Sequence, residues 1–346
     1  MRLTMKLLLC FFAALHVFGA GAQTDSLLVV SWNVENFLDP RTDSTGRYTF
    51  GRFRSKCNAI SKTLLLIAGR YGRLPDAVAL MEVGDRYVLE RLLRDTPLRK
   101  LDYSIIHYDS PDRRGIDCAL LYRRSTLTLL RSAPMHLYDS SGALMRTRDI
   151  LLAEFDGLAI LVNHHPSKVG GDSERRRAVA MSRMQALMDS LDQRRVLERS
   201  DAGGVGGYAP RPLGVQGDSS RHRRPVLAVG DFNDDVWPHD GPQPAAEGTI
   251  KYNGAWEKID GYFARGLNVS ESVFSDPILS APDRSFGGTK PRRSFSGPRW
   301  LGGVSDHYPV VFQIVIDNAS SCSHTSRSGR RDSFVSLLRP LRLLDG

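Results

Sequence analysis

The sequence predicts an α/β layered domain, and two features of its pattern carry this prediction. Short runs of Val, Leu and Ile each stop at a polar residue, which is typical of buried β-strands. Between these runs, apolar side chains recur every three or four residues, which is typical of one face of a helix. Buried strands need helices over the faces of their sheet, so the two features together predict layers of strands and helices.

Four expected strands end at side chains that can carry chemistry. Because strand ends at one rim of a sheet form a rigid frame, we expect these side chains to build a single polar site. The four runs and the polar residues after them are 27–30 with Asn33, 77–81 with Glu82, 159–162 with Asn163, His164 and His165, and 226–230 with Asp231 and Asn233.

The remaining elements follow from the same patterns. Helices are expected around Ile60, Leu64 and Ile67, and again over residues 178–191, where apolar side chains lie three to four apart. A last strand, residues 310–316, follows Ser305-Asp306-His307. Residues 201–225 are rich in Gly and Pro, which predicts a loop.

The composition is that of a globular protein with a basic surplus. Of the 346 residues, 41% are hydrophobic and 25% are charged, which excludes wholesale disorder and a collagen-like repeat. The 47 Lys and Arg residues against 38 Asp and Glu residues give a formal charge of +9. This surplus favours polyanionic partners such as nucleic acid or phosphorylated lipid, and the sequence indicates no obligate protein partner.

Both ends of the chain are expected to lie outside the domain, which then covers residues 23–317. Residues 1–22 place Arg2 and Lys6 before an apolar run and end in small residues, the pattern of a cleaved secretory signal peptide. An uncleaved anchor is the alternative. Cleavage would make the protein secreted, either periplasmic or extracellular. Residues 318–346 form a C-terminal extension, either a disordered tail or a short amphipathic helix.

Residues 284–300 interleave cationic with aromatic side chains. This pattern suits contact with phosphates together with stacking on bases, and it makes Arg292 and Arg293 candidate substrate-binding residues. A solvated loop with a few packing anchors is the alternative.

Oxygen-bearing side chains at the strand ends indicate a hard divalent cation. Asp231 and Asn233 lie two residues apart, so an extended chain places both on one face. Carboxylate and amide oxygens are the ligands that Mg²⁺, Mn²⁺ and Ca²⁺ prefer. Glu82, taken alone, is equally consistent with a helix cap or a salt bridge.

Seven motifs, taken in order, resemble those of the endonuclease/exonuclease/phosphatase superfamily and look like a secreted bacterial branch of it. Each motif is weak alone, but their shared order across residues 31–308 is specific. The motifs are Trp32-Asn33-Val34-Glu35, Met81-Glu82-Val83, Gly115–Tyr122, Asn163-His164, Gly230-Asp231-Phe232-Asn233, Ile259-Asp260 and Ser305-Asp306-His307.

The resemblance implies a four-layer α/β sandwich, with two central mixed β-sheets face to face and helices outside. It also implies a metal-dependent phosphoric ester hydrolase that uses Mg²⁺ or Mn²⁺, with Ca²⁺ as a further option. Glu82 would be the principal metal ligand, and Asn33, Glu35 and Asp306 would surround the same ion.

The resemblance further implies how the other site residues act. Asp231 and Asn233 would orient the attacking water and the scissile phosphate, and Asn163 would help to hold the phosphate. His307, held by Asp260, would act as a general base or polarise the phosphate. His164, paired with Asp117, would serve the leaving oxygen from the opposite side, and His165 would be structural.

A secreted nuclease, cleaving phosphodiester bonds of nucleic acid as an endonuclease, is the leading hypothesis from the sequence. A sphingomyelinase-like or inositol-phosphatase-like enzyme, acting on phosphorylated lipid or a small phosphoester, is the first alternative. A catalytically inactive phosphate-binding module is the second alternative. The expected metal ligands and both imidazoles are present, which argues against an inactive module.

Overall fold

The structure is a computed structural model that describes residues 26–43, 46, 48–192, 224–235 and 248–316. The expected signal peptide (1–22) and C-terminal extension (318–346) lie outside these residues, as does most of the expected loop 201–225. No helix in the described part of the chain is both long enough and apolar enough to span a membrane.

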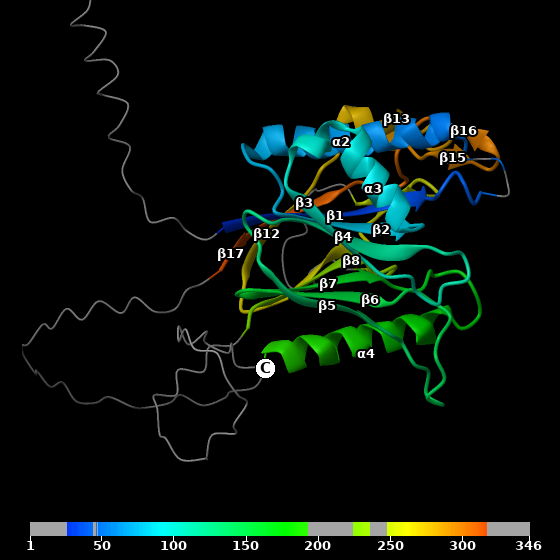
Figure 1. Ribbon diagram of the computed structural model, residues 1–346. Helices are drawn as coiled ribbons and strands as arrows, with labels where there is room; N and C mark the ends of the chain where they lie inside the picture. Colours follow the sequence, from blue (N-terminus) through cyan, green and yellow to red (C-terminus); the bar gives the residue numbers. More distant parts are fainter. Residues whose placement is uncertain (1–25, 44–45, 47, 193–223, 236–247, 317–346) are drawn as a thin grey trace, which may run out of the picture.

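Two mixed β-sheets face one another at the centre of the fold (Figure 1). The strand order is β12-β17-β1-β2-β4-β3 in the six-stranded sheet and β11-β8-β7-β6-β5 in the five-stranded sheet. The first sheet contains β1 (Ser26–Phe37), β2 (Ala77–Val83), β3 (Tyr103–His107), β4 (Asp117–Arg123), β12 (Asn268–Val273) and β17 (Val310–Val315). The second contains β5 (Leu129–Met135), β6 (Ile150–Phe155), β7 (Leu158–His164), β8 (Val226–Asp231) and β11 (Asp260–Arg265).

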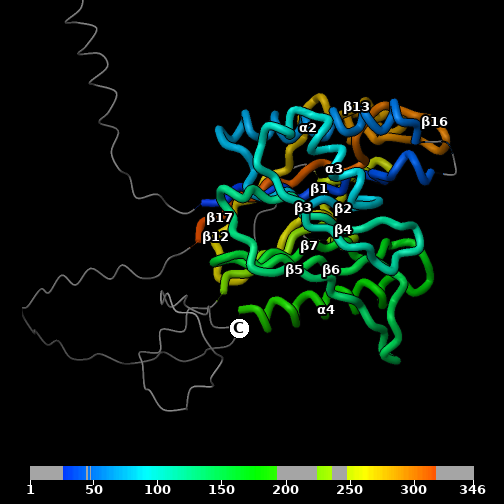
Figure 2. Tube along the Cα trace, viewed as in Figure 1, coloured from blue at the N-terminus to red at the C-terminus, as the bar shows by residue number. Residues whose placement is uncertain are grey.

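Helices cover the outer face of each sheet, as Figure 2 shows. The helices α2 (Phe50–Tyr71) and α3 (Arg86–Asp95) lie over the six-stranded sheet, and α4 (Ser173–Asp192) lies against the five-stranded sheet. The layers therefore run helix, sheet, sheet, helix, and the predicted four-layer sandwich is confirmed.

Short elements complete the fold outside the two large sheets. They are the 3₁₀ helices η2 (Pro97–Lys100) and η3 (Pro277–Leu279), and three two-stranded ribbons: β9 (Ile250–Tyr252) with β10 (Ala255–Glu257), β13 (Ser280–Pro282) with β14 (Thr289–Pro291), and β15 (Phe295–Ser296) with β16 (Arg299–Trp300).

Apolar side chains fill all three spaces between the four layers. Successive residues of a strand point to opposite faces, so in β1 Leu28 and Val30 pack toward α2 and α3 while Val29 packs between the sheets. On α4 the buried stripe includes Ala180, Met184 and Leu191, whereas Ala178, which the spacing assigned to the buried face, is exposed. Burial of these side chains on both sheet faces fixes the two sheets relative to each other.

The topology brings the polar strand ends to one rim. The pairs β1–β2 and β7–β8 are parallel, so their carboxyl ends share an edge within each sheet. The antiparallel neighbours β17 and β11 begin at that same edge, because Val310 pairs with Ser31 and Asp260 pairs with Asp231. Residues from six strands therefore meet at a single rim.

Gly230 permits the close approach of β7 and β8 just before Asp231. Its φ is +150°, and a Cβ placed there would lie 1.9 Å from the carbonyl oxygen of Asn163. We expect Gly230→Ala to lower the free energy of unfolding by about 3 kcal/mol or more, because the neighbouring backbone must move. Urea unfolding followed by circular dichroism measures this change.

A matched glycine elsewhere provides the control. A Cβ at Gly69, inside α2, would meet no atom within 4 Å. Gly69→Ala should therefore raise the free energy of unfolding by about 0.5 to 1 kcal/mol. Equal effects of the two substitutions would contradict the role given to Gly230.

Candidate active site

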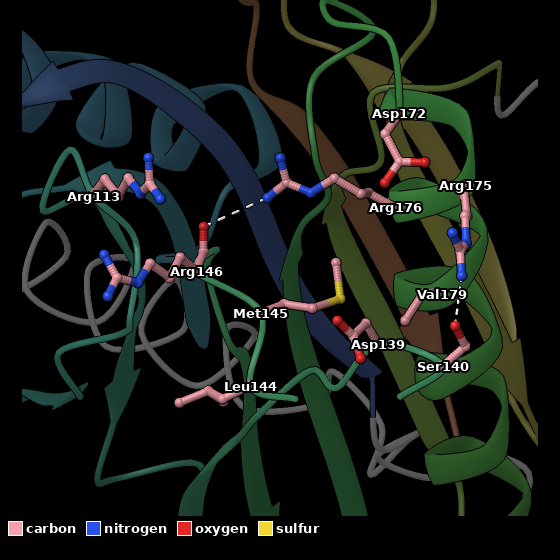
Figure 3. Close-up of a pocket in the computed structure, with 10 residues that line it drawn as sticks. All are labelled: Arg113, Asp139, Ser140, Leu144, Met145, Arg146, Asp172, Arg175, Arg176 and Val179. Carbon is pink, nitrogen blue, oxygen red and sulfur yellow. Dashed lines mark hydrogen bonds between the residues drawn. The ribbon is translucent and has the colours of Figure 1, made fainter. Parts of the chain in front are cut away.

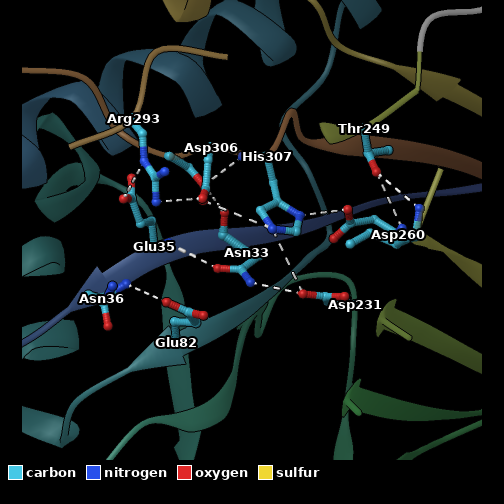
Figure 4. Close-up of polar contacts among 12 residues, drawn as sticks. Asn33, Glu35, Asn36, Glu82, Asp231, Thr249, Asp260, Arg293, Asp306 and His307 are labelled. Carbon is cyan, nitrogen blue, oxygen red and sulfur yellow. Dashed lines mark hydrogen bonds and ion pairs between the residues drawn. The ribbon is translucent and has the colours of Figure 1, made fainter. Parts of the chain in front are cut away.

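His307 and Asp260 form a buried imidazole–carboxylate pair that joins the two sheets. The ring Nδ1 of His307 donates to Asp260 Oδ2 at 2.7 Å, so the predicted contact is present (Figure 4). Burial opposes a charge on the ring, but the carboxylates of Asp260, Asp231 and Asp306 outweigh burial and hold the pKa of His307 well above its usual range. The ring is therefore cationic at neutral pH, with Nε2 directed away from Asp260.

Backbone and hydroxyl contacts hold this pair in place. Thr249 Oγ1 accepts hydrogen bonds from the backbone N–H groups of Ile259 and Asp260 at 3.3 Å. Ser305 Oγ donates to the Asn33 carbonyl at 2.6 Å and accepts from the His307 N–H at 3.0 Å. These contacts orient the ring, because each one fixes a main-chain atom next to it.

Asp231 Oδ2 is the point at which three other side chains converge. It accepts a hydrogen bond from Asn33 Nδ2 at 3.0 Å, and it lies 3.6 Å from His164 Nε2 and 3.9 Å from His307 Nε2. Burial, and then the Asp260 charge, raise the pKa of Asp231 to about 7. Two imidazoles thus share one carboxylate, which differs from the expectation of separate pairs on opposite sides of a phosphate.

The predicted pairing of Asp117 with His164 is wrong. Asp117 Oδ2 lies 3.4 Å from His107 Nε2, and its Oδ1 accepts hydrogen bonds from the backbone N–H and the hydroxyl of Ser110. His164 Nδ1 is buried and has no partner among the described residues. The reason is register, since β3 pairs with β4 and places His107, at its end, nearer to Asp117.

His164 and His165 differ in what their rings contact. The His165 ring packs edge-on against Phe232, 5.1 Å between centroids, and burial lowers its pKa to about 3. Burial, followed by the charges of Arg148 and Arg114, holds the pKa of His164 well below its usual range. Only His164 faces Asp231, so the geometry favours His164 over His165 as the functional ring.

Of the expected substrate-binding residues, Asn163 is placed otherwise than predicted. Asn163 is fully buried, and its amide nitrogen donates to the carbonyls of Leu161 and Val229, so no donor remains for a phosphate. Arg292 is exposed and donates to the Leu301 carbonyl at 3.1 Å. Asn163 therefore holds β7 against β8, which corrects the prediction that it binds phosphate.

Asn233 lies at the rim with a strained backbone. Its φ is +51°, its N–H donates to Asp231 Oδ1 at 2.9 Å, and its amide nitrogen donates to the His165 carbonyl at 3.0 Å. Five described non-glycine residues have positive φ, and four of these lie at the rim. They are Glu35, Asn36, Glu82 and Asn233. Such concentration is typical of functional sites.

The expected metal ligands occupy the other half of the rim. Register shifts after Asn33 and after Met81 mark irregularities in β1 and β2, which turn Glu35 and Glu82 away from ordinary strand positions. Asn33 Oδ1 accepts from the Glu35 N–H at 2.9 Å, and Glu82 Oε2 accepts from the Asn36 N–H at 2.8 Å. Figure 4 shows Asn33 and Glu35 near Asp306 and His307, and Glu82 next to Asn36.

Arg293, which was predicted to bind substrate, lies among these acids with 48% of its side chain exposed. Its guanidinium is 2.9 Å from Asp306 Oδ2 and 3.2 Å from Glu35 Oε1. Within the described residues, Glu35, Glu82 and Asp306 do not form a group whose ligand atoms all lie within 4.8 Å, whereas Asp231, Asp260 and His307 do. The acids therefore share one rim, but in this structure they surround a guanidinium.

Lys56 is a site residue that the sequence reasoning missed. Its side chain is buried below the acids, and its Nζ donates to the Glu35 carbonyl and, at 2.9 Å, to Ser294 Oγ. Burial lowers the pKa of Lys56 to about 8, although Glu35, Glu82 and Asp306 oppose this. The sequence signal was a lysine one helical turn before Ile60, on the apolar stripe of α2.

The residues present fit a hard divalent cation. Glu35, Glu82 and Asp306 supply carboxylate oxygens and Asn33 supplies an amide oxygen, the donor set preferred by Mg²⁺ and Mn²⁺. Burial, and then the neighbouring Asp306, raise the pKa of Glu35 to about 7, against the opposing charges of Lys56 and Arg293. Lys56 and Arg293 therefore do not fully neutralise the three acids, and a divalent ion would supply the missing positive charge.

Comparison with known proteins shows similarity to one family. The sequence profile of the endonuclease/exonuclease/phosphatase family matches residues 29–198. Over these residues, slightly less than half of its length, the chain resembles this family. Endonuclease/exonuclease/phosphatase enzymes are metal-dependent phosphoric ester hydrolases and use divalent ions, typically Mg²⁺ or Mn²⁺. No curated protein sequence matches the chain.

Several solved structures resemble this chain at low sequence identity. ANGEL2, described as a 2′,3′-cyclic phosphatase, has a TM-score of 0.50 and 11% identity over 84% of this chain and 96% of its own. Humanized D. rerio TDP2 has a TM-score of 0.48 and 15% identity over 84% of this chain and 99% of its own. A family member from Bacteroides thetaiotaomicron has a TM-score of 0.48 and 15% identity, covering 85% and 98%.

The cationic and aromatic residues of 284–300 fall into two groups. Phe295 and Trp300 pack edge to face, 4.9 Å between centroids, and Phe295 also contacts Tyr48, so both are packing anchors. Phe286 is exposed, and Lys290 pairs with Asp283 at 3.1 Å. The anchored aromatics fit the alternative of a solvated loop with packing anchors, whereas Arg284, Arg292 and Arg299 form no ion pair with any residue that the structure describes.

Proposed function

We propose that this enzyme is a secreted, divalent-metal-dependent phosphodiesterase that cleaves nucleic acid as an endonuclease. The observation that carries the proposal is the convergence at Asp231 Oδ2, where His164, His307 and Asn33 meet beside the cluster of acids. A buried carboxylate between two imidazoles, next to hard oxygen donors, suits hydrolysis of a phosphodiester more than simple binding of one.

Asp231 is placed to activate the attacking water. Its pKa of about 7, raised by burial and Asp260, matches the pH at which a general base works most efficiently. Asn233 is fixed by its bonds to Asp231 and His165 and so orients the same water. Asp231 and Asn233 therefore both orient the attacking water, as expected, and Asp231 in addition accepts its proton.

The two imidazoles then act on phosphate oxygens in different protonation states. His307 is cationic, with Nδ1 bound to Asp260, so its Nε2–H can donate to a non-bridging oxygen as negative charge develops there. This favours phosphate polarisation over the general-base role for His307. His164 is neutral, and one N–H of its ring can donate to the leaving oxygen.

The acids at the rim would hold the metal ion. Glu82, Glu35, Asp306 and Asn33 are the residues that would bind it, and when bound it would polarise the phosphate and neutralise the developing charge. Arg293, whose guanidinium now contacts Glu35 and Asp306, would be left free to contact a phosphate oxygen.

Charge and the N-terminal pattern support the remaining parts of the proposal. Without residues 1–22, which carry Arg2 and Lys6 and no acid, the formal charge is +7, and this charge favours a polyanion over a neutral lipid headgroup. Residues 1–22 have the pattern of a secretory signal, which supports secretion.

A hydrolysis panel tests the proposed substrate and the metal requirement together. We expect the mature protein to cleave DNA or RNA internally in Mg²⁺ or Mn²⁺, and to lose this activity in excess chelator, with recovery when the ion is restored. Sphingomyelin and inositol phosphates are the comparison substrates. Faster turnover of either, or nuclease activity that persists in chelator, would overturn the proposal.

A further inference from the structure

A cavity of about 470 Å³ lies beside the start of α4, outside the site described above. Two loops and the first turns of α4 enclose it: the loop between β3 and β4, the loop between β5 and β6, and residues 172–179. Figure 3 shows Arg113, Arg146 and Arg176 on one side of it. The lining residues are Arg113, Asp139, Ser140, Leu144, Met145, Arg146, Asp172, Arg175, Arg176 and Val179.

The cavity carries a surplus of positive charge. Four arginines and two aspartates line it, which leaves a net charge of +2. Asp139 Oδ1 accepts hydrogen bonds from the Ser141 N–H and hydroxyl and from the Ala143 N–H, so it is engaged within its own turn. The four guanidinium groups repel one another, which raises the free energy of the empty cavity. A bound anion would offset this repulsion.

Two of these guanidinium groups are free to bind an anion. Arg113 and Arg146 are exposed, and their side chains make no hydrogen bond or ion pair with any residue that the structure describes. Arg175 donates to Ser140 Oγ and Arg176 donates to the Arg146 carbonyl, so these two hold the cavity walls together. Arginines in the first turn of α4 oppose the helix dipole, so they do not serve to stabilise the helix.

The loops that form the cavity are also the loops that hold the active site. Arg148, two residues after Arg146, donates to the His165 carbonyl and lies 3.3 Å from Asp112, next to Arg113. Arg177, next to Arg176, donates to the Ser167 carbonyl and lies 3.6 Å from Asp234, next to Asn233. The cavity therefore adjoins the His164 and Asn233 side of the active site.

We propose that this cavity binds a backbone phosphate of the nucleic-acid substrate that flanks the scissile phosphodiester. The guanidinium groups of Arg113 and Arg146 contact that phosphate, and the apolar side chains of Leu144, Met145 and Val179 contact the attached nucleoside. This inference rests on the proposed nuclease function. It predicts that the enzyme distinguishes long from short substrates.

The test compares two double variants that lose the same charge. R113Q/R146Q removes the two free guanidiniums, and R54Q/R183Q removes two exposed arginines outside the cavity lining. Binding of a fluorescent oligodeoxynucleotide is measured by anisotropy in chelator, which prevents cleavage, at several salt concentrations. Hydrolysis of bis(p-nitrophenyl) phosphate, which reaches only the scissile position, is measured with metal.

We expect R113Q/R146Q to raise the Kd for a long oligonucleotide about tenfold at low salt and to reduce the slope of log Kd against log salt by about 1 to 2. R54Q/R183Q should change the Kd less than about twofold, because its charges lie outside the cavity. Hydrolysis of the small substrate should be unchanged in both variants, because neither pair touches the scissile phosphate.

Three outcomes would overturn the inference. If the wild-type enzyme cleaves nucleic acid but R113Q/R146Q has an unchanged Kd and salt slope, the cavity does not bind the substrate. The proposed nuclease function is then unaffected. A wild-type protein that neither binds nor cleaves nucleic acid, yet hydrolyses the small substrate, overturns both. Loss of binding to phosphatidylglycerol vesicles with unchanged oligonucleotide binding would assign the cavity to a lipid headgroup instead.

Discussion

His307→Ala is expected to lower kcat/KM for nucleic-acid cleavage by about a thousandfold, which corresponds to about 4 kcal/mol of activation free energy. The ring supplies a cationic donor in a buried site, and the surrounding carboxylates that hold its charge remain after the substitution. Metal binding should stay near normal, because the acids at the rim are retained. Steady-state kinetics and Mn²⁺ binding measure the two effects, and turnover at the wild-type rate would show that the site is misassigned.

The pH dependence of activity tests how Asp260 acts on this ring. The Asp260 carboxylate raises the pKa of His307, so the cationic ring persists to a higher pH than its ordinary pKa of 6.5 allows. The stability contributed by the charged pair is present below the ordinary pKa and is lost as the pH rises through the raised pKa. Activity, which also needs an ionised Asp231, should have its alkaline limit at that raised pKa. In Asp260→Asn this alkaline loss should move to lower pH.

A second histidine–carboxylate pair provides the control for Asp260→Asn. His136 Nδ1 lies 2.9 Å from Asp149 Oδ2, outside the active site. Asp149→Asn should leave the pH profile of kcat unchanged. An alkaline limit that stays in place in Asp260→Asn would contradict the assigned role of Asp260.

Glu82→Ala is expected to remove most activity by weakening metal binding. Loss of a residue that only hydrogen-bonds to a metal ligand lowers metal affinity about 10- to 100-fold. Loss of a carboxylate that binds the ion directly should lower the affinity at least as much, so we expect the Kd for Mn²⁺ to rise about 100-fold or more. Isothermal titration of the protein with Mn²⁺ measures this without relying on turnover. Glu90→Ala, on the exposed face of α3, is the matched control and should bind Mn²⁺ as the wild type does.

Activity with wild-type metal affinity in Glu82→Ala would remove Glu82 from the ligand set. The comparison with His307→Ala then separates two kinds of loss, because that variant should bind the ion normally and still turn over slowly. The two variants together test whether the acids and the imidazole perform different tasks at one rim.

The strands were predictable from short apolar runs, whereas the His307–Asp260 contact was predictable only from the resemblance of the motifs at 259–260 and 305–307 to those of the family. The runs at 27–30, 77–81, 159–162 and 226–230 lie in β1, β2, β7 and β8. Parallel pairing then places their polar ends together, so the convergence required no knowledge of the loops.

The parts that could not be predicted depend on register and on contacts distant in sequence. The partner of Asp117 depends on how β3 pairs with β4, which brings His107 to it. Lys56 reaches Glu35 and Ser294 only after α2 docks on the sheet. The contacts of Arg293 depend on how residues 291–303 fold back over β1, a path with no periodic pattern in the sequence.

The active site is divided between two structural halves. Asn33 and Glu82 belong to the six-stranded sheet and His307 lies just before its strand β17, whereas Asp231, Asp260 and His164 belong to the five-stranded sheet. The hydrogen bonds from His307 to Asp260 and from Asn33 to Asp231 cross the boundary between the two sheets. The alignment of the catalytic side chains therefore depends on the contacts between the two sheets. A small displacement of one sheet relative to the other would stop catalysis while leaving each sheet intact.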